Sequence, residues 1–163
     1  MEVEKAALAL DAALPRGIRV LAADAVDTHH AALMSQAAGA SYRVTLPYSG
    51  DVSAAVASFN AAPELLFKKA APKTKAKFKE IDVKFYIPQL TAEQTETETI
   101  FSFDCKITPT GSMKAVDLLN TLNEQYGLAL PVEMADIERL RLYRNNKNGK
   151  PIPMLNSDAV TLG

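Results

Sequence analysis

The fold is decided by the stretch Thr99-Ile-Phe-Ser-Phe-Asp-Cys-Lys-Ile107. Apolar side chains stand at most of its odd-numbered positions, and polar ones at most of the positions between them. A period of two is typical of a strand with one buried face. We therefore expect the longest strand of the protein here, and Ser41-Tyr-Arg-Val-Thr-Leu46 predicts a second one by the same alternation.

Helical periodicity marks three other segments. In the first, Val3, Ala7, Leu10 and Leu14 recur at spacings of four, three and four, which predicts an amphipathic helix. Residues 51–62 and 112–126 each carry an apolar stripe, and a glycine follows the second of them. Both segments are predicted to be helices.

The remaining segments are shorter. Residues 18–21, 64–67 and 137–144 are predicted to be strands from their apolar and alternating residues. Residues 80–87 alternate clearly and are predicted to be another strand, whereas the polar, acidic residues 89–97 are expected to form a loop. The apolar layer of the sheet is expected to contain Tyr42, Val44, Leu46, Val83, Phe85, Phe101, Phe103, Leu140 and Leu142.

This order of elements predicts an α+β fold. We expect a ferredoxin-like plait with a mainly antiparallel sheet and helices packed on one face. Residues 1–144 are expected to form a single domain, with an N-terminal helix, short strand and loop in 1–40 and the plait core in 41–144. Residues 145–163 are expected to be a flexible tail.

Composition excludes several classes of protein. Of 163 residues, 48% are hydrophobic and 23% charged, which is typical of an ordinary globular domain rather than a disordered chain. A single cysteine excludes an internal disulfide and a multi-cysteine iron–sulfur site, so no cofactor is expected. The acidic N-terminus and the absence of a long apolar run favour a cytoplasmic location.

A lysine-rich segment is the most informative feature for function. Seven of the 18 basic residues lie between residues 68 and 84, against only two acids, which gives a local charge of +5. Such a concentration of charge favours a polyanion, with RNA the first candidate, and a solvated loop is the alternative. The lysines are Lys68, Lys69, Lys73, Lys75, Lys77, Lys79 and Lys84.

The last predicted strand adds a second candidate surface. Arg139, Arg141 and Tyr143 occupy alternate positions and therefore share a face, as in surfaces that hold single-stranded nucleic acid. Ion pairs with nearby acids explain the two arginines equally well.

Other reactive residues carry weaker hypotheses. His29 and His30 are adjacent, so they diverge in either regular structure, and no metal site is expected from them. Cys105 is expected to be a small buried hydrophobe. Asp82 and Asp104 lie on outward strand faces, where salt bridges to lysines are a better explanation than acid–base chemistry.

Three stretches together resemble a known family. They are Ala13-Leu-Pro-Arg-Gly-Ile-Arg-Val-Leu21, Lys75-Ala-Lys-Phe-Lys-Glu-Ile-Asp-Val-Lys84 and Ile137-Glu-Arg-Leu-Arg-Leu-Tyr143. In order and spacing they are similar to the radical SAM-linked protein family, a bacterial domain fused to, or encoded beside, a radical SAM protein. The resemblance reaches to about Tyr143, and the chain is expected to lack the N-terminal part that members usually carry.

The resemblance implies a radical SAM protein as partner and a role in RNA modification or maturation, and Lys79, Asp82 and Arg139 fall within its motifs. We therefore expect a non-catalytic accessory domain that binds RNA or another anionic substrate, with Asp82 orienting a basic side chain at the base of the lysine loop. The alternative is a protein-interaction module whose lysines dock on an acidic partner surface without nucleic acid.

Overall fold

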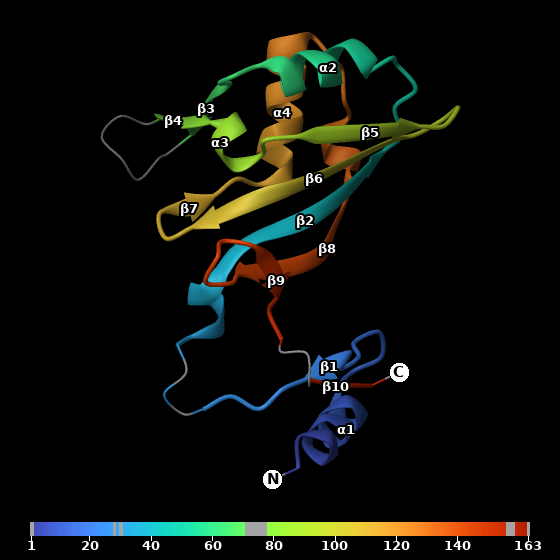
Figure 1. Cartoon of the computed structure of the whole chain (residues 1–163). Coiled ribbons are helices and arrows are strands. Elements are labelled where there is room, and N and C mark those ends of the chain that lie inside the picture. The colour runs from blue at the N-terminus through green and yellow to red at the C-terminus, as the bar shows by residue number, and fades with distance from the viewer. Residues whose placement is uncertain (1, 28, 30, 71–77, 156–158, 163) are drawn as a thin grey trace. The chain divides into compact units, whose positions relative to one another are not determined.

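The computed structural model of this chain describes residues 2–27, 29, 31–70, 78–155 and 159–162 (Figure 1). The chain divides into two compact units, one formed by residues 1–36 with 144–163 and the other by residues 37–143. This division differs from the predicted one, which placed residues 1–40 with the plait core and treated 145–163 as a tail.

The larger unit alternates strands and helices. Strands β2 and β6 are the long strands predicted from the two alternating stretches, and each extends beyond the predicted bounds. The elements in chain order are β2 (Ala37–Leu46), α2 (Ser53–Ala61), β3 (Leu66–Ala70), β4 (Phe78–Asp82), α3 (Val83–Tyr86), β5 (Leu90–Gln94), β6 (Thr99–Thr108), β7 (Gly111–Ser112), α4 (Ala115–Tyr126), the 3-10 turn η2 (Val132–Met134) and β8 (Asp136–Asn145).

The main sheet of this unit has the strand order β5-β6-β2-β8, and β7 pairs with β6. The pairs β2–β6, β5–β6 and β6–β7 are antiparallel, and β3 and β4 form a separate antiparallel hairpin. The predicted α+β class with a mainly antiparallel sheet is confirmed. Without β3, β4, α3 and β7 the elements follow a β-α-β-β-α-β order, and the ferredoxin-like plait stays a prediction.

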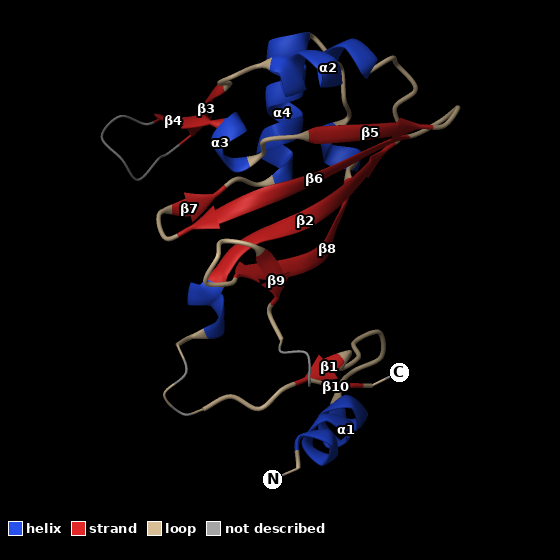
Figure 2. Ribbon diagram, in the orientation of Figure 1, coloured by secondary structure: helices blue, strands red, loops and turns tan. Residues whose placement is uncertain are grey.

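The core lies between this sheet and its helices. Val44 and Leu46 of β2 and Phe101 of β6 are fully buried, and they belong to one cluster with Phe59 of α2 and Leu118 of α4. Figure 2 shows α2 and α4 on the same side of the sheet. Because side chains alternate along a strand, the residues between these buried ones project from the opposite face.

Three sequence predictions in this unit are wrong. Residues 83–86 form α3 instead of continuing a strand, so Val83 and Ile87 are fully buried while Phe85 is 51% exposed. Part of the predicted acidic loop is the strand β5, of which Leu90 is fully buried against the core. The expected apolar layer also fails at Leu140, which is 46% exposed on β8.

The smaller unit contains α1 (Val3–Ala13), β1 (Ala22–Ala23), the 3-10 turn η1 (Leu33–Gln36), β9 (Pro151–Pro153) and β10 (Val160–Thr161). Strand β1 pairs antiparallel with β10. The strand predicted at residues 18–21 lies just before β1 in the chain. Asp11 of α1 accepts hydrogen bonds from the Arg19 side chain and from the Val20 backbone. These bonds, the Arg19 one foremost, hold the pKa of Asp11 below its usual value.

Helix α4 ends at Gly127, which has a left-handed backbone with φ of +65° and donates to the Asn123 carbonyl. A side chain is strained in this conformation. We expect Gly127→Ala to lower the free energy of unfolding by about 1 kcal/mol, and Gly127→Asn to lower it less because asparagine tolerates the left-handed region. Urea denaturation followed by circular dichroism measures both, and equal losses in the two variants would contradict this cause.

Among the described residues, no helix is long and apolar enough to cross a membrane.

Candidate anion-binding surfaces

The β3–β4 hairpin carries the described part of the lysine segment. Its register places Lys69 directly opposite Lys79, and like charges opposite each other destabilise a strand pair. The Lys69 ammonium relieves this repulsion by binding the Asp117 carboxylate of α4, at 2.5 Å. This ion pair holds the hairpin against α4, and the Lys69 side chain is only partly exposed.

Lys68 and Lys79 are exposed, and no carboxylate of the described residues forms an ion pair with either of them. Glu80 occupies the position directly opposite Lys68 in the register but forms no ion pair with it. Phe78 is 60% exposed. The register places it on the hairpin face that carries Lys68, whereas Lys79 projects from the face that carries Lys69. The hairpin therefore presents two unpaired ammonium groups and an aromatic side chain. The predicted anion-binding lysines Lys73, Lys75 and Lys77 lie outside the described residues.

Lys84 is turned toward the protein rather than outward. Its ammonium lies 4.6 Å from the centre of the Phe59 ring and donates a hydrogen bond to the Pro88 carbonyl. Burial lowers the pKa of Lys84, and the neighbouring Asp82 carboxylate opposes this shift. A lysine in this position stabilises the contact of α3 with α2 and offers little of its charge to a ligand.

Asp82 begins α3 as its N-cap residue. One carboxylate oxygen accepts hydrogen bonds from the backbone N–H groups of Leu65 and Lys84, at 3.1 and 3.0 Å. These bonds fix the start of α3 to the chain just before β3, which is the usual work of an N-cap aspartate. Asp82 therefore orients backbone at the base of the hairpin, where the sequence predicted that it would orient a basic side chain.

The open face of the main sheet brings together Arg141 and Tyr143 of β8 with residues of β2. Arg141 donates from Nε to the Ser41 hydroxyl at 3.0 Å, and Ser41 donates to the Asp104 carboxylate of β6. Tyr143 lies over Gly39, where an added Cβ would come within 2.2 Å of its hydroxyl. Burial, and after it the Asp104 charge, raises the pKa of Tyr143.

Arg139 is exposed two positions from Arg141 on the same strand. It forms no ion pair within the described part of the chain, whereas Arg43 lies 3.9 Å from Glu138, a long and exposed pair that contributes little. The predicted grouping of side chains from alternate β8 positions is thus present for Arg141 and Tyr143.

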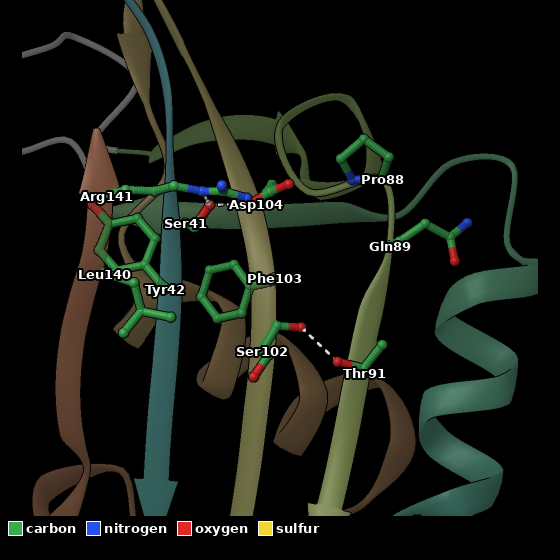
Figure 3. A pocket seen from close by; sticks show the side chains of 10 residues that line it. All are labelled: Ser41, Tyr42, Pro88, Gln89, Thr91, Ser102, Phe103, Asp104, Leu140 and Arg141. Carbon is green, nitrogen blue, oxygen red and sulfur yellow. Dashed lines mark hydrogen bonds between the residues drawn. The ribbon is translucent and has the colours of Figure 1, made fainter. Parts of the chain in front are cut away.

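A groove of about 430 Å³ adjoins the Arg141–Ser41–Asp104 chain of contacts (Figure 3). Apolar atoms make up most of its wall, and hydroxyl groups from β5 and β6 add to its polar part. Its lining residues are Ser41, Tyr42, Pro88, Gln89, Thr91, Ser102, Phe103, Asp104, Leu140 and Arg141.

The other reactive residues are not gathered into one site. Cys105 is buried, donates to the Met113 carbonyl and has a pKa raised by burial, as expected of a structural thiol. Asp82 and Asp104 have separate partners and do not share an enclosed pocket. The described residues contain no group of three or more metal-ligating side chains, and His30 lies outside them.

Sequence reasoning missed Ser41, which connects Arg141 to Asp104. The only signal for it was the polar side chain in an otherwise apolar start of the strand, and the partner residues lie 63 and 100 positions away. Its importance appears only once the strand order is known.

Comparison with known proteins gives the family. A protein-family model described as "Uncharacterized protein conserved in bacteria (DUF2344)" matches residues 1–117. The chain belongs to this family. No curated protein and no solved structure matches it.

Proposed function

We propose that this chain is a non-catalytic accessory domain that binds single-stranded RNA through the β3–β4 hairpin. The observation that carries the proposal is the pair of exposed ammonium groups, Lys68 and Lys79, that have no carboxylate partner among the described residues. Unpaired cations of this kind attract a phosphate backbone and release its counterions on binding.

The exposed ring of Phe78 supports RNA over other polyanions. An aromatic side chain beside lysines is the usual arrangement in proteins that stack unpaired bases and hold the backbone beside them. Phe78 is 60% exposed, and a ring of this size gains little by facing water. The hairpin face that carries Phe78 and Lys68 thus offers both parts of such a surface.

We also propose a radical SAM protein as the partner, on the strength of the three stretches that resemble the radical SAM-linked protein family. The chain carries one cysteine, whereas a cluster-binding protein needs several cysteine ligands. Radical chemistry would then belong to the partner, and this chain would hold the RNA substrate for it.

The test is a filter-binding assay of the whole chain with a single-stranded RNA of mixed sequence. We expect the double variant Lys68→Ala, Lys79→Ala to bind about 20-fold more weakly at 0.1 M salt, since each lost phosphate contact removes a factor of about five. The matched control is Lys5→Ala, Lys147→Ala, which removes the same charge from exposed positions elsewhere.

Two outcomes would refute the proposal. One is equal weakening by the two double variants, which would indicate non-specific attraction. The other is an absence of RNA binding at low salt, and capture of an acidic protein by the same lysines would then support the interaction-module alternative. Circular dichroism of each variant checks that the fold is intact.

A further inference from the structure

The chain of contacts on the open sheet face holds an arginine in place. Arg141 extends from β8 across β2 toward β6, with its guanidinium beside Ser41 and Asp104 (Figure 3). Ser41 is only 7% exposed, and its hydroxyl both accepts from Arg141 and donates to Asp104. A hydroxyl fixed from both sides leaves the guanidinium little freedom.

The positive charge of Arg141 is not neutralised by an ion pair within the described residues. Within the part of the chain that the structure describes, Arg141 forms no ion pair, and its one hydrogen bond uses Nε. The two terminal nitrogens remain as parallel donors. A guanidinium presents these donors in a fork that matches the oxygens of a phosphate or carboxylate.

The adjoining groove has the size and chemistry of a small-ligand site. Its volume of about 430 Å³ lies within the range of roughly 300–1,000 Å³ that such pockets occupy. Its wall is mostly apolar, which suits the face of a nucleobase. Asp104 has one oxygen bound to Ser41 and presents the other as an acceptor for a hydroxyl group.

We infer that this groove binds a ribonucleotide, with the phosphate on Arg141 and the ribose hydroxyls on Asp104. A phosphate is favoured over a carboxylate because the site pairs one anion-binding fork with one acceptor for hydroxyls. Both groups belong to a ribonucleotide, whether free or at the end of an RNA strand. The inference concerns a surface other than the lysine hairpin and does not depend on it.

Calorimetric titration of the whole chain with adenosine 5′-monophosphate tests the inference. We expect saturable binding that Arg141→Met weakens 10-fold or more, because hydrogen bonds to a charged group are lost. The matched control is Arg16→Met, which removes an exposed guanidinium elsewhere in the chain and is expected to leave the affinity unchanged. The 2′,3′-dideoxy nucleotide should bind more weakly to the native chain, and Asp104→Asn should reduce that difference.

A 5′-phosphorylated tetranucleotide distinguishes the two sources of the ligand. Binding as tight as that of the mononucleotide indicates an RNA end, and exclusion of the tetranucleotide indicates a free nucleotide. The double variant Lys68→Ala, Lys79→Ala is expected to retain mononucleotide binding, which separates this site from the hairpin. Absence of saturable binding, or equal affinity in Arg141→Met and the native chain, would overturn the inference.

Discussion

Phe59→Ala is expected to lower the free energy of unfolding of the larger unit by about 3–5 kcal/mol. Phe59 is fully buried in the main cluster, so its truncation leaves a cavity between α2 and the sheet. The Lys84 ammonium over its ring also loses its aromatic partner. This is a large part of the 5–15 kcal/mol that stabilises a typical domain.

Chemical denaturation followed by far-ultraviolet circular dichroism measures this loss, since the chain has no tryptophan to report by fluorescence. The matched control is Phe78→Ala, which removes the same ring from a position that is 60% exposed. We expect the control to change stability by less than about 0.5 kcal/mol. Similar losses in the two variants would contradict the burial that the structure assigns to them.

The two phenylalanines also separate folding from function. Phe78→Ala is expected to weaken RNA binding while leaving the fold intact, because the proposed stacking of a base needs the exposed ring. Phe59→Ala acts on the core and only indirectly on the hairpin.

The periodicity of the sequence was sufficient for the long strands and failed at α3. Ile81, Val83, Phe85 and Ile87 alternate, and that pattern favours a strand. Val83 and Ile87 are also four residues apart, so one helical turn buries both and leaves Phe85 exposed. Asp82 favours the helical turn over the strand because its side chain caps the start of α3. An aspartate before this turn is a helix-start signal, which the strand-like alternation outweighed in the prediction.

Strand β5 shows a different limit. Its sequence is polar because it lies at the end of the strand order and buries few side chains, with Leu90 the fully buried one. Local patterns predict a loop for such a segment, and only pairing with β6 makes it a strand. The paired residues lie between 5 positions (Gln94 and Thr99) and 13 positions (Leu90 and Phe103) apart along the chain. The propensity of residues 90–94 taken alone does not contain this pairing.

The candidate site was predictable from the sequence only where it depends on alternation within one strand. Alternation along residues 137–144 predicted that Arg141 and Tyr143 share one face. In the structure they lie over the β2 residues Ser41 and Gly39. Pairing of Arg141 with Ser41, and of Ser41 with Asp104, depends on β2 lying between β8 and β6. The pattern of residues within a single segment does not predict the order of strands in the sheet.

The affinity of the whole chain for single-stranded RNA is expected to fall about 100-fold when monovalent salt rises from about 50 to 200 mM. Five lysines that each contact one phosphate give a slope of about −3.5 for log affinity against log salt. They are the exposed Lys68 and Lys79, together with Lys73, Lys75 and Lys77, which lie outside the described residues. Lys69 and Lys84 are left out of this sum because Asp117 and the Pro88 carbonyl hold them.

Filter binding at several salt concentrations measures the slope. The lysine variants show which lysines contribute to it. Removing Lys68 and Lys79 should reduce it to about −2.1, so that the same rise in salt weakens binding only about 20-fold. Unrelated RNA sequences should give the same slope, because phosphate contacts do not read bases. If the native slope is shallower than about −1, or if the double variant keeps the native slope, the hairpin lysines do not contact phosphates and RNA binding by this surface is refuted.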